Sequence, residues 1–261
     1  MDFSLILFLF LVVTGLIILV YRQFFEEREL TLSTGNGKSQ PVIVEYAKAL
    51  FPVVLVVFLL RSFVVEPFRI PSGSMLSTLH TGDFILVNKF KYGIRLPVVN
   101  TKVFPISSPN RGDVMVFKYP KDPKLNFIKR VIGLPGDTLK YENKELFING
   151  EKVTTVADGK YAFEQENMRG QSARQLIETI DGSSHRILVN DNVTRSLDME
   201  VTVPEGHYFV MGDNRDHSND SRYWRFVPED HIVGHAFFIW FSWKTLSGGG
   251  VAWERIGSSI E

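Results

Sequence analysis

The sequence predicts a mainly β protein, in which an antiparallel β-sheet domain with an attached lobe follows two transmembrane helices. Three observations lead to this fold class. Apolar residues gather in two segments near the N-terminus, and the remainder carries short runs of β-branched and aromatic residues between turn signals. No helical period is sustained outside the two apolar segments, and residues 173–180 are the one candidate exception.

The composition narrows the classes of protein to which the chain can belong. Its 261 residues suit one large domain, or one domain with attachments. The 29 basic residues balance the 29 acidic ones, which argues against a nucleic-acid partner, because such proteins usually carry a basic excess. Cysteine is absent, so disulfides, thiol nucleophiles and zinc sites built on cysteine are excluded.

The first apolar segment predicts a membrane span. Residues 3–21 contain no charge, and a helix of this length measures about 28 Å, close to the thickness of a bilayer core. The alternative is a cleaved signal peptide, which has a basic start and a shorter apolar run. The only charged side chain before this run is Asp2. We therefore expect residues 1–21 to form the first transmembrane helix.

The second apolar segment predicts a membrane span less strongly. Residues 49–60 are uncharged but short enough to be a buried core helix. Residues 62–65 extend the segment to a spanning length, and Arg61 near its end can reach the headgroups. We expect a second transmembrane helix over residues 47–65, after a loop over residues 22–46.

The basic residues near the two spans predict their orientation. None precedes the first span, whereas four follow it and are assigned to the loop: Arg22, Arg28, Lys38 and Lys48. The positive-inside rule places this loop in the cytoplasm and both chain ends outside. Residues 66–261 then form an exported β domain, in which a more polar and less regular lobe covers about residues 140–203.

Six runs in the exported domain read as strands. Asn149-Gly150 follows one of them and is the strongest short hairpin signal in the chain. The runs are residues 84–87, 114–117, 127–132, 146–148, 208–211 and 233–241.

No metal or cofactor is expected. His231 and His235 have the spacing of a metal pair, but they lack the intervening Glu of a metalloprotease helix and lie in strand sequence. The acidic stretch over residues 213–220 does not fit the register of a calcium loop and reads as a dense turn. Nothing favours a Ser-His-Asp triad.

A serine and a lysine remain as candidate reacting groups. Ser72 and Ser74 flank Gly73 about a dozen residues beyond the second span, which is a reasonable way to present a hydroxyl. Without a cysteine or a persuasive histidine, the base for such a serine would be a lysine whose pKa is lowered by burial. Periodicity alone does not choose among three lysines in apolar strand sequence, which are Lys89, Lys118 and Lys129.

At this point the chain resembles the bacterial type I signal peptidases (leader peptidases), a family of membrane proteases with a Ser-Lys dyad. The resemblance rests on four motifs in the family's order, behind two spans of matching topology. The motifs are Ile70-Pro71-Ser72-Gly73-Ser74-Met75, then Gly82-Asp83 to Arg95, then Arg111-Gly112-Asp113-Val114 with Phe127 to Asp137, and finally Met211 to Trp224.

The resemblance implies a role for each matching residue. Ser74 is the nucleophile and Lys129 is the general base. The hydroxyl of Ser72 and the backbone N–H of Ser74 form the oxyanion hole, and Ser218 orients the lysine. The residues implied to support the site without reacting are Asp213, Asp220, Arg222 and Arg130.

The implied activity is removal of N-terminal signal peptides from secreted preproteins with A-x-A-type cleavage sites. The implied location is the bacterial inner (cytoplasmic) membrane, with two spans and the catalytic domain on the periplasmic side. The partners are then secretory preproteins and the lipid bilayer, with no cofactor. The alternative is a membrane-tethered, non-catalytic β-domain that binds exported chains. A self-cleaving repressor is a weaker rival, because it needs a soluble DNA-binding segment.

Two residues depart from the family pattern, and one run leaves an alternative open. His217 stands where Asn is usual, and Arg225 stands where Gly is usual. The aromatic run over residues 237–243 reads either as an ordinary core strand or as a segment that enters the membrane interface.

Overall fold

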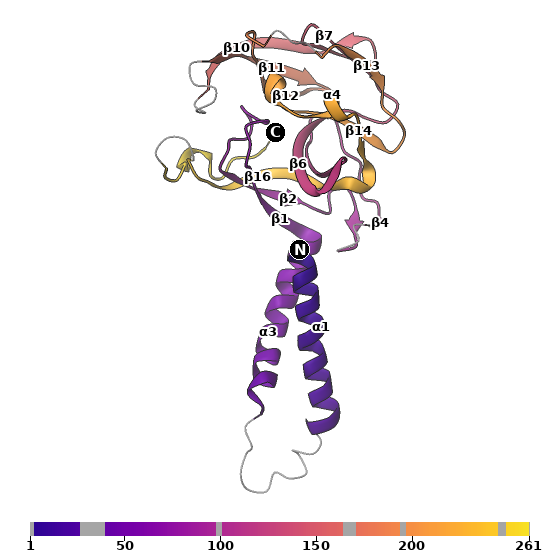
Figure 1. The fold of residues 1–261 in the computed structure, drawn as a ribbon, viewed down its shortest axis with the longest axis vertical. Helices are drawn as coiled ribbons and strands as arrows, with labels where there is room; N and C mark the ends of the chain where they lie inside the picture. Colours follow the sequence, from indigo (N-terminus) through magenta and orange to yellow (C-terminus); the bar gives the residue numbers. More distant parts are fainter. Residues whose placement is uncertain are drawn as a thin grey trace. The chain divides into compact units, whose positions relative to one another are not determined.

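The computed structural model describes residues 3–26, 40–97, 101–163, 171–193, 197–244 and 249–260 (Figure 1). Arg28 and Lys38, on which part of the orientation argument rests, lie outside these residues. The chain divides into two units. The first extends to Val65 and includes a short segment from Arg95 to Thr101, and the second holds the remainder.

Two apolar helices, α1 (Phe3–Tyr21) and α3 (Val42–Leu59), pack against each other in the first unit. Each helix continues into one π-helical turn, over Arg22–Glu26 and Leu60–Val64 respectively. Among the described residues, the helical stretches Ser4–Phe25 and Val42–Val64 are long and apolar enough to cross a bilayer. Their lengths correspond to about 33 Å and 35 Å of helix.

The second helix begins at Val42, ahead of the predicted start at residue 47. Pro41 precedes it with an extended backbone (φ −55°, ψ 131°), so the helix starts directly after the proline. Glu45 lies in the first turn, where the positive end of the helix dipole favours a carboxylate. The charged residues Glu45 and Lys48 are thus part of the helix, although they interrupt the apolar run from which its start was predicted.

A seven-stranded sheet forms the centre of the second unit, with strand order β1-β2-β16-β5-β6-β14-β15. Its neighbours from β2 to β15 pair antiparallel. Five of the six predicted runs lie in this sheet, which confirms them. The strands are β1 (Val65–Arg69), β2 (Asp83–Asn88), β5 (Val114–Tyr119), β6 (Asp122–Gly133), β14 (His207–Met211), β15 (Val227–Pro228) and β16 (Ile232–Ser242).

Both faces of the sheet are covered at its centre. Val114 and Val116 of β5 belong to one buried cluster, whereas Met115 and Phe117 belong to another. Successive side chains of a strand point to opposite faces. A strand buried on both faces is apolar throughout, which explains why β5 reads as a continuous apolar run.

The described part of the predicted lobe forms two further sheets, so the prediction that this region is less regular is wrong for these residues. The hairpin after β8 is confirmed, because Asn149 and Gly150 both have a positive φ in the turn to β9. The lobe's sheets have the orders β13-β7-β8-β9 and β10-β11-β12. Their strands are β7 (Thr138–Glu142), β8 (Glu145–Ile148), β9 (Glu151–Lys152), β10 (Thr154–Ala162), β11 (Ser172–Ile180), β12 (Ser183–Val189) and β13 (Met199–Thr202).

The candidate helix over residues 173–180 is wrong, because this segment is strand β11. It pairs antiparallel on both sides: Leu176 lies opposite Ala157 of β10 and opposite Ile187 of β12. Hydrogen bonds to strands on both sides outweigh the weak local preference of a short, mixed sequence for a helix. The other short elements are β3 (Ile94–Arg95), β4 (Lys102–Phe104), α4 (Ser221–Trp224) and the 3₁₀ turns Arg215–His217, Glu229–His231 and Trp253–Arg255.

Helix α4 ends at Arg225, which has a φ of +78° and a ψ of −112°. This conformation favours glycine, the residue that the family resemblance leads us to expect there. The exposed side chain of Arg225 is thus carried on a strained backbone.

We expect Arg225→Gly to stabilise the fold by about 1 kcal/mol, because relief of about 1–3 kcal/mol of strain exceeds the 0.5–1 kcal/mol entropic cost of glycine. Thermal unfolding of the full chain in detergent micelles measures the effect. Tyr223→Gly is the matched control, since Tyr223 is exposed in the same helix without a positive φ, and it should destabilise by about 1 kcal/mol. Equal losses from both changes would contradict the strain at Arg225.

Candidate functional site

The loop between β1 and β2 carries Ser72 and Ser74. Its ends are joined by backbone hydrogen bonds of Ile70 to Asp83 (2.8 Å) and to Gly82 (2.9 Å). Met75, directly after Ser74, is fully buried in the core beneath the sheet. The loop is thereby anchored at its base and beside the serine.

The structure brings Ser74 and Lys129 together from positions 55 residues apart. Lys129 lies on β6, and its Nζ donates to Ser74 Oγ at 2.6 Å and to the carbonyl of Ile128 at 2.8 Å. The hydroxyl of Ser72 lies 3.5 Å from that of Ser74. Of the two rival lysines, Lys89 pairs instead with Glu66, at 2.9 Å.

Burial lowers the pKa of Lys129 to about 8. The side chain is almost fully buried, and loss of hydration outweighs the opposing effect of the nearby carboxylates of Asp220 and Asp213, while Arg222 acts in the same direction as burial. At this pKa roughly one lysine in ten is neutral at pH 7, compared with about one in 2,500 in water. The amine can therefore accept a proton near neutral pH.

A buried ion pair joins β6 to the end of β14. Arg130 donates to both oxygens of Asp213, at 2.9 and 2.8 Å, and to the carbonyl of Gly112 at 2.7 Å. Thr78, just after the loop's Ser74, donates its hydroxyl to the same carboxylate. Burial would raise the pKa of Asp213, but the Arg130 guanidinium outweighs it and holds that pKa below its usual range.

A second buried ion pair stands at the start of α4. Arg222 donates to both oxygens of Asp220, at 2.9 and 2.8 Å, and the backbone N–H of Gly212 donates to Asp220 at 3.0 Å. Burial would raise the pKa of Asp220, but Arg222 outweighs it and keeps the carboxylate charged. The four supporting residues thus form two separate pairs, each with two parallel hydrogen bonds.

Ser218 is buried beside the same strand end. A Cβ added at Gly212 would collide with the Ser218 hydroxyl and with the carbonyl of Ser74, so the three residues are in close contact. The Ser218 hydroxyl makes no hydrogen bond within normal geometry to any residue that the structure describes, although it lies close enough to Asp220 to help lower the pKa of that carboxyl. A bond from Ser218 to Lys129 stays a prediction.

Asn214 contacts the serine loop directly, and the sequence analysis missed it. Its backbone N–H donates to the carbonyl of Ser74 at 3.1 Å, and its side-chain amide donates to the carbonyl of Gly73 at 3.0 Å. The available signal was the dense polar turn over residues 213–220, whose side chains are expected to bond backbone groups. The backbone N–H of Ser74 makes no hydrogen bond to the described residues and is thus an available donor.

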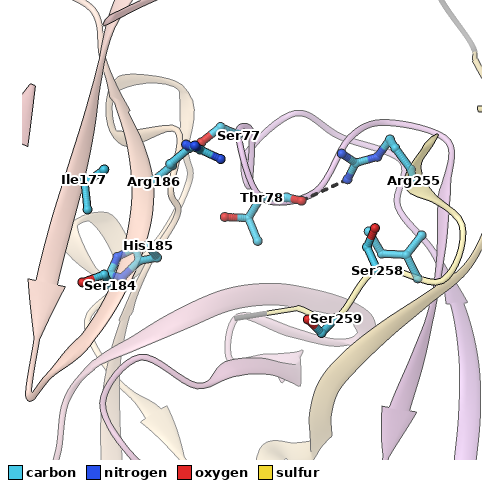
Figure 2. A pocket seen from close by; sticks show the side chains of 10 residues that line it. Ser77, Thr78, Ile177, Ser184, His185, Arg186, Arg255, Ser258 and Ser259 are labelled. Carbon is cyan, nitrogen blue, oxygen red and sulfur yellow. Dashed lines mark hydrogen bonds between the residues drawn. The ribbon is translucent and has the colours of Figure 1, made fainter. Parts of the chain in front are cut away.

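A cavity of about 450 Å³ lies nearby but does not contain the pair of Ser74 and Lys129 (Figure 2). It is bounded by Thr78, by His185 and its neighbours in β12, and by the C-terminal segment. Arg255 closes one side through a 3.0 Å hydrogen bond to the carbonyl of Thr78. Among the described residues, no three side chains of His, Asp or Glu lie close enough together to hold a metal ion.

Comparison with known proteins identifies the family. The family described as "Signal peptidase, peptidase S26" matches residues 43–243. Proteins called signal peptidase I from Pseudomonas aeruginosa and Pseudomonas fluorescens are each 46% identical, over 271 and 269 residues that cover 93% of this chain and 93% of each relative. A crystal structure of a signal peptidase I from Enterococcus faecalis V583 is 31% identical over 50% of this chain and 97% of that chain, with a TM-score of 0.34.

A β-sheet protein with a serine hydroxyl against a buried lysine amine, and with these relatives, is a peptidase. The chain belongs to the signal peptidase family, peptidase S26. The alternative of a non-catalytic β-domain is not favoured by these similarities.

We expect Lys129→Met to raise the free energy of unfolding by about 3 kcal/mol at pH 7, because a buried ammonium is replaced by an apolar side chain of similar length. The pKa of Lys129 is about 8 in the folded chain and about 10.4 when unfolded. The unfolded state therefore binds more protons between these values, and wild-type stability rises with pH there.

The gain should be constant below pH 8 and shrink toward pH 10.4. Chemical unfolding of the full chain in detergent across this range measures it, with Lys160→Met in the exposed part of β10 as the control. A gain that does not depend on pH would contradict a buried, titrating Lys129.

Proposed function

We propose that this chain is a membrane-bound serine endopeptidase that removes N-terminal signal peptides from secretory preproteins through a Ser74-Lys129 dyad. The observation that carries the proposal is the 2.6 Å contact between Lys129 Nζ and Ser74 Oγ. The names of the family and of its relatives supply the kind of substrate.

The chemistry follows from this contact. Neutral Lys129 accepts the proton of Ser74 as Oγ attacks the scissile carbonyl carbon. The ammonium then gives that proton to the leaving amine, so the peptide C–N bond breaks and an ester to Ser74 remains. Lys129, neutral again, takes a proton from water, whose oxygen attacks the ester, and the proton returns to Ser74 as the acid product leaves.

Two donors suit the oxyanion that develops in each attack. One is the backbone N–H of Ser74, which has no acceptor among the described residues, and the other is the hydroxyl of Ser72 beside it. Ser218, in this proposal, orients the lysine ammonium. The ion pairs of Asp213 with Arg130 and of Asp220 with Arg222 hold the surrounding backbone and do not react.

The free edge of β6 supports an extended peptide substrate. Strand β14 pairs only with the last part of β6, from Arg130 to Gly133, so the β14 side of residues 122–129 is unpaired within the described chain. A peptide that adds a strand there passes Lys129 and presents alternate side chains to the same face. Pockets for the residues one and three before the cut would then select the A-x-A pattern.

The same proposal places the chain in the bacterial inner (cytoplasmic) membrane. Both apolar helices cross the bilayer, the loop over residues 22–46 lies in the cytoplasm, and residues 66–261 form the catalytic domain on the periplasmic side. Strand β16 supports contact with lipid, because it buries Ala236 and Ile239 in the core yet exposes Trp240, and Trp243 directly after the strand is also exposed. Trp is favoured at the membrane interface.

Cleavage of a purified preprotein by the full chain in detergent tests the dyad. Ser74→Ala and Lys129→Ala should each lose nearly all activity, because one lacks the attacking atom and the other lacks the base. Wild-type kcat/KM should fall as the pH decreases below about 8, since protonated Lys129 cannot accept the proton of Ser74. Lys89→Ala, which removes another lysine in apolar strand sequence, should retain activity. Normal cleavage by both dyad variants would refute the proposal.

Ser72→Ala tests the oxyanion hole. Loss of one such donor typically costs about 3–4 kcal/mol in the barrier, so kcat should fall by about 10²–10³ while the fold persists. Ser72 is exposed, and its removal leaves no buried polar group without a partner. Turnover within threefold of wild type, with thermal unfolding unchanged, would remove Ser72 from the hole.

A further inference from the structure

The turn between β14 and α4 has contacts on two sides. Of residues 213–216 in this turn, two face the site: Asp213 pairs with Arg130, and Asn214 holds the carbonyls of the serine loop. The next two face the lobe, because Arg215 pairs with Glu178 and Asp216 pairs with Lys144. The residues that line the site and the residues that contact the lobe are thus consecutive in the chain.

The contact of Arg215 with Glu178 is the most buried of these. Arg215 Nη1 donates to Glu178 Oε1 at 2.8 Å, and Nη2 donates to Oε2, so the guanidinium and the carboxylate meet in two parallel bonds. Both side chains are at most 2% exposed. His185 of β12, opposite Glu178 in the lobe sheet, lies 3.1 Å from the same carboxylate.

Arg215 also connects to the ion pair beside Lys129. Its backbone carbonyl accepts a hydrogen bond from Arg222, whose guanidinium holds Asp220. Asp220 in turn accepts from the backbone of Gly212, which contacts the carbonyl of Ser74. Buried polar contacts therefore run from Glu178 in the lobe to Gly212, which packs against the carbonyl of Ser74.

The contact of Lys144 with Asp216 strengthens the same junction. Lys144 Nζ lies 3.0 Å from Asp216 and donates to the carbonyl of Asn190 at 2.7 Å, while the backbone N–H of Asn190 donates to Asp216 at 2.8 Å. The ring of Tyr141 adds a third contact, because the Arg222 guanidinium lies 5.1 Å from its centre. Strand β7, the turn after it and strand β11 therefore all contact the segment over residues 213–222.

We propose that Glu178 and Lys144 are positioning residues, through which the lobe fixes the turn over residues 213–222 against Ser74 and Lys129. This inference rests on the proposed peptidase activity and assigns the lobe a part in it. The lobe then acts on the rate of the chemical steps. We expect it to leave peptide binding unchanged, because residues 122–129 of β6, along which the peptide is proposed to pair, belong to the central sheet and hydrogen-bond to β5 and not to a lobe strand.

Steady-state cleavage of a purified preprotein by the full chain in detergent, below the unfolding temperature of every variant, tests the inference. Glu178→Gln should lower kcat about tenfold, or ~1.4 kcal/mol, with KM changed less than twofold. Lys144→Met, which removes a less buried ion pair, should lower kcat about threefold. It replaces Glu178→Gln as the test if that variant does not fold. A wild-type kcat in whichever of these variants folds overturns the inference.

The double variant Glu178→Gln, Arg215→Gln separates positioning from the cost of an unpaired buried charge. If the pair positions the turn, the double variant stays slow, because the two parallel hydrogen bonds between charged groups are not restored. If kcat returns to the wild-type value, the single variant was slow only because Arg215 lacked its partner. That result also overturns the inference.

Asp191→Asn is the matched control on the same lobe. It removes an ion pair with Arg174 of β11, in which both side chains are more than half exposed, and it should leave kcat unchanged. A loss equal to that of Glu178→Gln would mean that any change in the lobe slows the enzyme, which contradicts a specific role. If the wild type itself does not cleave, the proposed function fails. If it cleaves and Glu178→Gln cleaves equally fast, only this inference fails.

Discussion

The burial of Lys129 against Ser74 is the constraint on which the rest of the site depends. An amine must lose most of its hydration for its pKa to reach about 8, and the cost of that loss is borne by the folded state. The lysine lies where a strand of the central sheet, the serine loop and the turn after β14 meet, so all three must pack closely. A peptidase that uses a lysine base therefore requires a rigid, well-anchored β core around one polar group.

The charges around Lys129 limit how far its pKa falls. Asp213 and Asp220 raise it, yet each is engaged by an arginine in two parallel bonds, so neither carboxylate is free to pair with the ammonium. An unpaired aspartate next to Lys129 would keep its amine protonated near neutral pH. The two ion pairs thus engage both buried carboxylates, so that Lys129 next to them can still lose its proton.

Much of the architecture was predictable because it depends on local patterns. Two uncharged apolar stretches identified both long helices, and all six predicted strands exist, since β-branched runs between turn residues are readable over a few positions. Residues 173–180 failed this approach, because pairing with β10 and β12 decides their conformation, and a pattern read within one segment does not contain those partners. The start of α3 was missed because Glu45 and Lys48 interrupt the apolar run although both lie within the helix.

The candidate site shows most clearly what the sequence determines and what only the tertiary structure decides. The sequence by itself determined the residue types, the apolar spans and the ordered motifs that point to a serine and a lysine. Strand periodicity treats Lys89, Lys118 and Lys129 alike, and the ordered motifs pointed to Lys129 only through the family resemblance. The tertiary structure decided that this lysine meets Ser74, since the 2.6 Å contact joins segments 55 residues apart. It also showed that Asn214, Glu178 and Arg215 belong to the same network, because their partners lie on other strands and loops. Contacts of this kind follow from the packing of sheets, which no local pattern encodes.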